Sequence, residues 1–335
     1  MLKMTKCFAE TTDQRVISNI IDDTMQHLRV SGSVLLRETY KSPWAINIPN
    51  ASTMSKLLNI NSDEQVVAFH LVEFGHCLIS SEQGDNILLK AGEILICFGG
   101  RAHRLSQGTA VAGEDISTLL QGGPNIQKPH QATDVESAAL LCGMFLLQHT
   151  AFNPLFNALP PLVHITLSKQ GELHNLSGVA RIMADEIDRN AMGSGYIVKR
   201  LLEVLCAEVV RAHIESASHQ KGNWLQAIKD PVVSRAIAAI HAAPGDNWSV
   251  LRLANAVAMS PSRFAARFSE SVGDSPMSYL AKWRMNLASQ KLKESNQSID
   301  LIAYNVGYES PAAFSRAFKK HLGFSPASWR IQKAS

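Results

Sequence analysis

The sequence predicts an α+β protein of several domains, with a β-rich N-terminal half, a helical middle segment and an all-α C-terminal third. Three observations predict this. Short β-type runs alternate with Gly, Pro and Asn between residues 33 and 106, apolar residues recur at helical spacing in residues 12–30, 173–189 and 196–214, and the last hundred residues contain an internal repeat. We expect domains at residues 1–165 and 230–333, joined by a helical segment at 166–222.

Composition and length limit the classes of protein to consider. The chain has 335 residues, of which 18% are charged and 46% hydrophobic, as in ordinary globular proteins. No apolar run reaches about 18 residues, so no membrane span is expected. The N-terminal segment lacks the apolar stretch of a signal peptide, and we therefore expect a cytoplasmic location.

The five cysteines are scattered, odd in number and without a C-x-x-C pair: Cys7, Cys77, Cys97, Cys142 and Cys206. This pattern favours reduced, buried thiols over a disulfide framework or a structural zinc site. A thiol of lowered pKa can also sense oxidants, so redox sensing by Cys77, Cys97 or Cys142 is an alternative.

The charge is unevenly distributed. Residues 230–335 hold 13 Lys and Arg and 7 Asp and Glu, a net charge of +6, whereas residues 1–229 carry a net charge of −3. A basic C-terminal module beside a mildly acidic one favours an anionic partner for the former.

The N-terminal half contains seven β-type runs, at residues 33–40, 44–49, 66–72, 76–81, 86–90, 93–98 and 138–147. Regular short strands with turn signals predict a small sandwich or barrel. A loop is expected at 152–162, two helices at 173–189 and 196–214, and a polar linker at 216–223. The second of these helices is apolar over a wide arc and therefore buries more than one face, either between the domains or as the interface of a homodimer.

The C-terminal repeat pairs residues 249–276 with 298–326. Ser249, Ala254 and Val257 recur 49 residues later, with Ile302 in place of Leu253, and Ser260, Pro261, Phe264, Phe268 and Gly273 recur 50 residues later. Each half predicts a helix, a turn and a second helix, with Ser as N-cap, Pro at the first helical position and Gly at the end. The 20-residue connection at 276–295 predicts a helical rod of about 30 Å, close to the spacing of successive major grooves.

This region resembles the DNA-binding region of the AraC/XylS family of bacterial regulators. The resemblance covers about residues 230–333 and is carried by Ile302-Ala303, Val306-Gly307-Tyr308, Phe314, Phe318-Lys319, Gly323, Ser325-Pro326 and Trp329-Arg330, where Trp329 replaces the family's usual Tyr. It implies that the second helix of each unit contacts bases or backbone of double-stranded promoter DNA through Ser262, Arg263, Ala265, Ala266 and Arg267, and through Pro311, Ala312, Ser315, Arg316 and Lys319.

Among these residues, Arg316 is the best candidate for a guanine contact, whereas alanines offer only apolar contact. Lys320, Lys282 and Arg284 are candidates for phosphate contacts. Each of these cations has the alternative of a solvated surface charge, and Arg284 that of a buried helix-end ion pair.

Residues 13–165 resemble the cupin-like sensor domain of one branch of the same family. Gly92, Gly100 and His103 match the second cupin motif, in which Phe98 replaces the proline, and residues 68–76 lie where the first motif belongs. The resemblance implies a small-molecule effector, for which the candidate ligands are Trp44, His70, His103 and Arg104, although Trp44 fits a plain core residue equally well.

Metal-dependent cupins use a His-x-His pair, a Glu and a later His. Here His70-Leu71-Val72 breaks the pair, and on an unbent strand Glu73 faces away from His70. A divalent metal such as zinc held by His70 and His103 is a further alternative. Two neutral ligands alone bind a metal weakly, so no cofactor is firmly expected.

Together these patterns predict a non-enzymatic, dimeric transcription regulator. By resemblance we expect an activator that works with RNA polymerase and responds to a small molecule or a stress. The alternatives are a metal-dependent cupin enzyme with an accessory DNA-binding region, and an architectural DNA-binding protein with a vestigial barrel.

Overall fold

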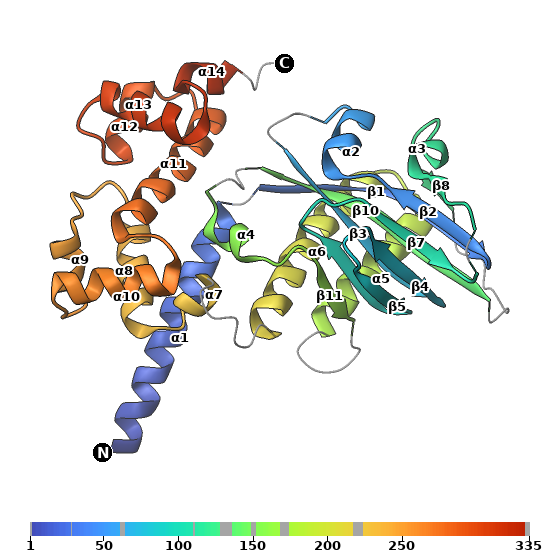
Figure 1. The fold of residues 1–335 in the computed structure, drawn as a ribbon, viewed down its shortest axis with the longest axis horizontal. Helices are drawn as coiled ribbons and strands as arrows, with labels where there is room; N and C mark the ends of the chain where they lie inside the picture. Colours follow the sequence, from blue (N-terminus) through green and yellow to red (C-terminus); the bar gives the residue numbers. More distant parts are fainter. Residues whose placement is uncertain are drawn as a thin grey trace. The chain divides into compact units, whose positions relative to one another are not determined.

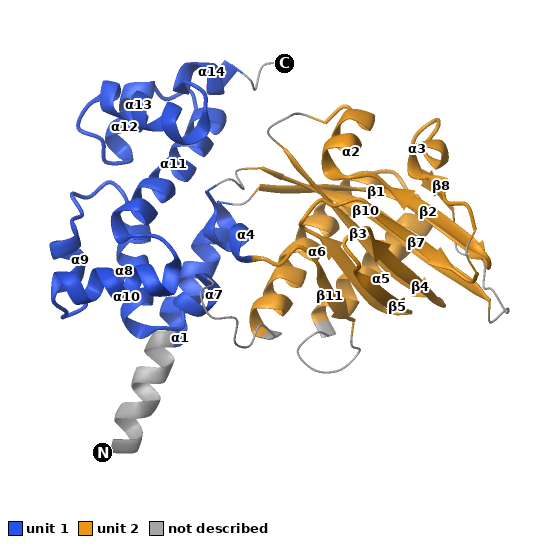
Figure 2. Ribbon diagram, viewed as in Figure 1, with its two compact units in different colours: residues 1–28, 149–158, 217–335 blue, residues 29–148, 159–216 orange. Residues whose placement is uncertain are grey.

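The structure is a computed structural model that describes residues 2–27, 29–60, 64–109, 111–127, 136–148, 152–167, 174–216 and 224–331 (Figure 1). The chain forms two compact units. One comprises residues 29–148 and 159–216, and the other residues 1–28, 149–158 and 217–335 (Figure 2). We call the first the sensor unit, after the cupin-like sensor domain that its sequence resembles, and the second the helical unit. None of the described helices is long and apolar enough to cross a membrane.

The sensor unit contains two β-sheets. Sheet A has the strand order β11-β6-β3-β10-β1-β9 and sheet B the order β5-β4-β7-β2-β8. The strands of sheet A are β1 (Arg29–Lys41), β3 (Gln65–Phe74), β6 (Glu93–Cys97), β9 (Asn125–Ile126), β10 (Ser137–Gln148) and β11 (Val163–Thr166). Those of sheet B are β2 (Trp44–Ile48), β4 (His76–Ser81), β5 (Asn86–Lys90), β7 (His103–Gln107) and β8 (Glu114–Asp115). The pairing of the described strands gives two sheets, so the sandwich is seen and the predicted closed barrel is not confirmed.

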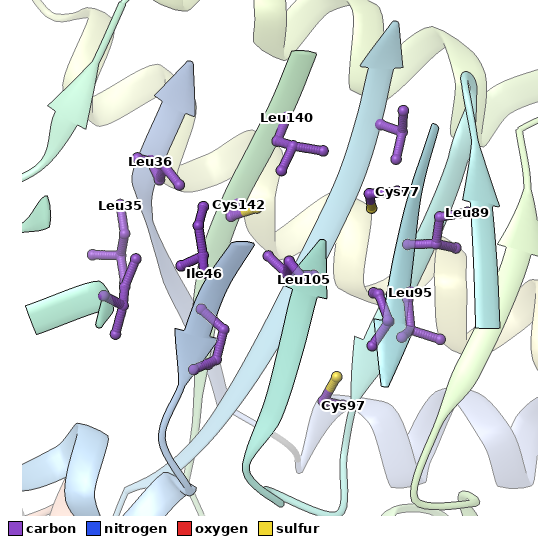
Figure 3. Close-up of a cluster of buried hydrophobic side chains, with 14 of the residues drawn as sticks. Leu35, Leu36, Ile46, Cys77, Leu89, Leu95, Cys97, Leu105, Leu140 and Cys142 are labelled. Carbon is purple, nitrogen blue, oxygen red and sulfur yellow. The ribbon is translucent and has the colours of Figure 1, made fainter. Parts of the chain in front are cut away.

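One hydrophobic core lies between the sheets. Leu36, Leu95 and Leu140 reach it from sheet A, and Ile46 and Leu105 from sheet B (Figure 3). These side chains are essentially buried because alternate residues of each strand face inward. The seven predicted strands are all present, whereas β7, β11 and the two-residue strands β8 and β9 were not predicted. In β7 the sequence HRLSQ offers few apolar residues, and its pairing with β2 and β4 places it in sheet B.

Short helices α2 (Ala51–Leu57) and α3 (Ile116–Leu119) belong to the connections of the sandwich. Two long helices, α5 (His174–Arg189) and α6 (Ser194–Ser216), complete the sensor unit. Helix α6 packs on β1 at Gly32, where a Cβ atom would lie 3.2 Å from the side chain of Leu202. Leu202, Leu205 and Val209 are fully buried on that side, whereas Tyr196 and Val204 remain exposed. The wide apolar arc of α6 therefore has one covered face and one open face.

A buried ion network joins α5 to sheet A. Arg37 of β1 is 3% exposed and binds both carboxylate oxygens of Glu73 in β3, at 2.9 and 2.8 Å, and Asp188 of α5 at 2.6 Å. Burial alone would lower the pKa of Arg37, but the hydrogen bonds and charges of Glu73 and Asp188 raise it above its ordinary value. The guanidinium is thus a fixed positive charge that ties three elements together.

The helical unit contains ten helices within its described residues: α1 (Leu2–Gln26), α4 (Pro154–Ala158), α7 (Trp224–Ala227), α8 (Pro231–Ala242), α9 (Val250–Ala256), α10 (Pro261–Val272), α11 (Pro276–Glu294), α12 (Ile299–Asn305), α13 (Pro311–Leu322) and α14 (Pro326–Ile331). The first of them ends at Gln26, so the predicted extension to Val30 is wrong. Strand β1 begins at Arg29, because residues 29–41 pair with β10.

Helix α1 packs with α8 and α11 inside the helical unit. Asp23 lies 3.0 Å from Nδ1 of the buried His241, and His27 contacts Trp283 edge-on at 5.3 Å. Asn153 donates to the carbonyl of Thr24 at 3.0 Å and joins the α4 segment to α1. The compact units therefore divide the chain differently from the expected domains: residues 1–28 and 149–158, expected in the sensor domain, lie in the helical unit, and most of the expected helical segment lies in the sensor unit. The predicted linker 216–223 lies almost entirely outside the described residues.

Candidate nucleic-acid interface and ligand pocket

Each repeat in the helical unit folds as a helix-turn-helix with its own small core. In the first, α9 and α10 bury Leu253, Ala254 and Phe264 completely; in the second, α12 and α13 bury Ile302, Ala303 and Phe314 completely. The alanines allow the paired helices to approach closely. Because both cores are filled by the repeated positions, the repeat in the sequence is a repeat in the structure.

The ends of these helices are built by local sequence. The side chain of Ser249 accepts a hydrogen bond from the backbone N–H of Arg252, and Ser310 accepts one from Ala313. At the start of α10, the side chain of Ser260 does not accept the expected capping hydrogen bond. The backbone of Ser260 is nevertheless extended, and Pro261 follows at the first helical position. Gly273 and Gly323 end α10 and α13 in the left-handed conformation, as predicted from their positions.

Arg284 of α11 joins the connection between α8 and α9 to the turn of the second helix-turn-helix unit. Its guanidinium donates to the carbonyls of Pro244 at 2.7 Å, Asp246 at 2.8 Å and Gly307 at 3.1 Å. Gly307 has φ +83°, and a Cβ atom there would lie 2.5 Å from a guanidinium nitrogen of Arg284. Arg284 therefore donates to backbone carbonyls inside the helical unit. These hydrogen bonds replace the phosphate contact that was predicted for Arg284 and the alternative of a helix-end ion pair.

Most residues predicted to contact DNA lie on the accessible face of α10 or α13. Ser262, Arg263, Ala266 and Arg267 of α10 and Ala312, Arg316 and Lys319 of α13 are exposed, and Ala265, Pro311 and Ser315 are half-buried. Among the described residues, Arg263, Arg316 and Lys319 make no ion pair with an acidic side chain. These three cations are therefore available to an anionic partner.

Arg267 is less available than its sequence position indicated. Its Nε donates to Asp230 at 2.8 Å, and Asp230 also caps the N-terminus of α8. Burial opposes the ionisation of Asp230, but the hydrogen bonds from Arg267 and from the backbone of Val232 and Val233 lower its pKa. A similar ion pair of Lys282 with Asp274, at 2.7 Å, competes with the phosphate contact predicted for Lys282.

A pocket of about 930 Å³ lies in the sensor unit. His103 and Arg104 of β7 line it, as predicted for effector ligands. The polar lining residues that sequence reasoning missed come from β2, α2, the end of β4 and the turn after it, and the α3 region: Asn47, Thr53, Lys56, Ser80, Ser81, Glu82, Asp115 and Ser117. Asn47 and Ser80 stand opposite Arg104 in the strand pairing, so a correct prediction of β7 would have brought these two residues to the site.

The other two predicted effector ligands do not line the pocket. Trp44 is a core residue whose indole N–H donates to the Gln107 side chain at 3.0 Å, in agreement with the alternative interpretation as core. His70 is 2% exposed and lies behind His103, with 2.7 Å between their Nε2 atoms. Arg104 lines the pocket, and its guanidinium is held by the carbonyl of Val111 and the side chain of Asn47.

The residues of a metal-dependent cupin are not gathered here. Glu73 binds Arg37, and His76, the last residue of the segment expected to hold the first cupin motif, is exposed on β4. Instead, the ligand atoms of His70, Cys97 and His103 lie within 4.8 Å of one another. The sequence indicated the two histidines, but the approach of Cys97 depends on how the strands pair.

Burial determines the protonation of these groups. It lowers the pKa of His70 well below its ordinary value, with a smaller contribution from His103. Burial also lowers the pKa of His103, although the hydrogen bond to the backbone of Arg101 acts in the opposite direction. Burial also raises the pKa of Cys77 and Cys97 to about 12 and that of Cys142 well above its usual range. These three thiols are therefore protonated and poorly suited to direct oxidant sensing.

Comparisons with known proteins agree with both halves of this architecture. A family model described as Cupin matches residues 19–215, and a model described as a helix-turn-helix domain matches residues 253–332. The regulator AlkR of Acinetobacter baylyi is 33% identical over 268 residues, 78% of this chain and 87% of that protein. A Streptomyces lividans protein named as an AraC-like transcription regulator is 32% identical over 268 residues, 79% of this chain and 87% of that protein.

A third relative is RclR of Escherichia coli, named an RCS-specific transcriptional activator. It is 27% identical over 289 residues, which is 83% of this chain and 96% of that protein. The order of the two matched regions, the repeated helix-turn-helix units and the extent of these alignments together establish the family. The chain belongs to the AraC-type transcription regulators, with an N-terminal cupin domain.

Proposed function

We propose that this protein binds promoter DNA by placing α10 and α13 in successive major grooves, and that a small molecule in the sensor pocket controls this binding. The observation that carries the proposal is the pair of filled helix-turn-helix cores on one connecting helix. Helix α11 has 19 residues and is therefore about 28 Å long, near the 34–36 Å between grooves on one DNA face.

The exposed residues of the two helices support unequal roles in base recognition. Helix α13 presents Arg316, which has five donors and the geometry for a bidentate contact to guanine. Helix α10 presents Ala266 and, partly, Ala265, which offer only apolar contact, for example to a thymine methyl group. Sequence preference then depends on few direct contacts together with DNA shape.

Replacing Arg316 with alanine tests this assignment. Loss of a bidentate base contact costs about 1–3 kcal/mol, so we expect affinity for the preferred site to fall by about 5- to 150-fold and the preference at one base pair to disappear. The preferred site is obtained by selection from genomic fragments and measured by gel shift at fixed salt.

Arg235→Ala is the matched control, because Arg235 is exposed on α8 of the same unit but lies outside α10 and α13. It should bind like the unaltered protein. Unchanged site preference in Arg316→Ala contradicts the role in base recognition, and failure to enrich any genomic fragment contradicts the proposed function as a whole.

We also propose that the protein acts as a homodimer through the open face of α6. Tyr196, Ile197 and Val204 are 67%, 43% and 45% exposed there, beside the ion pairs of Arg200 with Glu203 and of Arg211 with Glu208. Exposed apolar residues bordered by charged ones are typical of a protein interface. A dimer would bring two pairs of recognition helices to one promoter, which increases the phosphate contacts and the salt dependence of binding.

The double variant Ile197→Glu/Val204→Glu tests the dimer. Burying two carboxylates in an apolar interface is costly, so we expect a monomer in size-exclusion chromatography with light scattering at concentrations where the unaltered protein is a dimer. Lys90→Glu, an exposed charge change on β5, is the control. A monomeric unaltered protein, or an unchanged dimer in the double variant, contradicts the proposal.

We further propose that the protein activates transcription, because a relative supports this mode of regulation. RclR is named an activator, and an activator at a promoter acts together with RNA polymerase. A cytoplasmic location accompanies this role, since promoter DNA and the polymerase are there. The sensor pocket offers donors from Lys56, Arg104, Ser80 and Ser117 and acceptors from Glu82 and Asp115, which suit a polar effector that carries both oxygen acceptors and hydrogen-bond donors.

A further inference from the structure

Three buried side chains place metal-ligating atoms at one point between the two sheets. His70 comes from β3, Cys97 from the end of β6 and His103 from the start of β7. Nε2 of His103 lies 2.7 Å from Nε2 of His70 and 3.9 Å from Sγ of Cys97. All three are at most 9% exposed.

The strand register explains why Cys97 faces the histidines. Cys97 pairs with Ala68 of β3, and His70 lies two residues further along the same strand. Since alternate residues of a strand share a face, Cys97 and His70 project from the same side of sheet A. His103 follows Cys97 after a short turn that crosses to sheet B, in which Gly100 has φ +59°.

The hydrogen bonds of His103 define the chemistry at this point. Its Nδ1 lies 2.9 Å from the carbonyl of Arg101, which can only accept, so Nδ1 carries the proton and Nε2 presents a lone pair. Nδ1 of His70 is buried and has no hydrogen-bond partner among the described residues. The two imidazoles, neutral because of their burial, therefore direct Nε2 atoms at each other beside a thiol.

We propose that His70, Cys97 and His103 bind one zinc ion. Thiolate and imidazole together are a donor set that zinc prefers. Tetrahedral zinc, with Zn–N near 2.0–2.1 Å and Zn–S near 2.3 Å, separates two nitrogens by about 3.3 Å and nitrogen from sulfur by about 3.6 Å. The observed separations differ from these by about 0.6 and 0.3 Å, a change that side-chain rotation provides.

The fourth ligand position connects this site to the sensor pocket. Of the three ligands, only His103 lines the pocket. A zinc ion would therefore enter the site through the pocket, and its fourth coordination position would be open to a water molecule or an effector atom. On binding, the S–H bond of Cys97 breaks, a Zn–S bond forms and the proton passes to solvent. A bound ion would join sheet A to sheet B.

Metal titration of the full-length protein tests the site. The protein is prepared without a histidine tag, stripped of metal under reducing conditions, and titrated with Zn²⁺ against a chromophoric chelator and with Co²⁺ as a spectroscopic probe. We expect one equivalent of Zn²⁺ and, with Co²⁺, a thiolate-to-metal charge-transfer band. Cys97→Ser should remove that band and weaken Zn²⁺ binding at least about 100-fold, since it removes a ligand rather than a supporting contact.

Cys206→Ala is the matched control, because Cys206 is equally buried in the same unit but lies on α6, apart from the cluster. It should keep the affinity and the charge-transfer band. Less than about a tenth of an equivalent in the unaltered protein, or no charge-transfer band, overturns the proposal and indicates a direct hydrogen bond between the histidines. Equal affinity of Cys97→Ser also overturns it. These readouts do not involve DNA, so they are independent of the proposed function.

Discussion

Replacing Arg37 with methionine should lower the free energy of unfolding of the sensor unit by about 3–5 kcal/mol. The guanidinium is 3% exposed and is shared by Glu73 and Asp188, which are themselves 16% and 26% exposed. Methionine keeps much of the volume but leaves two neighbouring carboxylates without their cation. The cost comes from these unpaired charges more than from the lost ion pair itself.

Urea unfolding followed by hydrogen exchange of peptides from β1 and β3 reports on this unit separately from the helical unit. Arg189→Met is the control, since Arg189 is 67% exposed in its pair with Glu186 and its loss should cost at most about 1 kcal/mol. Adding Glu73→Gln and Asp188→Asn to Arg37→Met should restore part of the stability. A loss below about 1 kcal/mol in Arg37→Met would show that the network contributes little.

Replacing Arg284 with methionine should destabilise the helical unit by about 3 kcal/mol and reduce specific DNA binding below detection. Three backbone carbonyls, from Pro244, Asp246 and Gly307, lose a charged donor, and they belong to segments on both sides of α11. Partial burial lowers the pKa of Arg284, yet the guanidinium remains charged at neutral pH.

The measurement combines thermal unfolding with a gel shift on the selected DNA site at a temperature where the variant is folded. Lys282→Met is the control for stability, because Lys282 lies on the same helix as Arg284 and is 41% exposed in its ion pair with Asp274. It should cost less than about 1 kcal/mol. Full DNA affinity in a folded Arg284→Met protein would contradict the idea that these hydrogen bonds hold the two helix-turn-helix units in the orientation that DNA binding requires.

The C-terminal third was predicted well because its signals are local. Caps, proline at the first helical position and terminal glycine act within a few residues of the helix ends they define, and the repeat supplied each signal twice. The resemblance to AraC-type regulators implied the positions of Arg316 and Arg263, and both side chains are exposed on their helices.

Long-range pairings account for what the sequence did not predict. Arg267 and Arg284 were candidates for DNA contacts, but their partners are Asp230 and backbone carbonyls distant in the chain, and a carbonyl acceptor has no signature in a sequence. The pocket and the approach of Cys97 to the histidines depend on strand pairing between segments that are weakly patterned, such as β7.

The packing of α1 against His241 and Trp283 makes the helical unit discontinuous in the chain. A fragment cut at residue 230 would retain both recognition helices but expose the apolar surface that α1 covers, and it should be prone to aggregation. Exchanging sensors between relatives by a single junction would likewise separate α1 from its partners. Such chimeras need four junctions, near residues 28, 149, 158 and 217, so that the host keeps its own first helix and its own α4 segment.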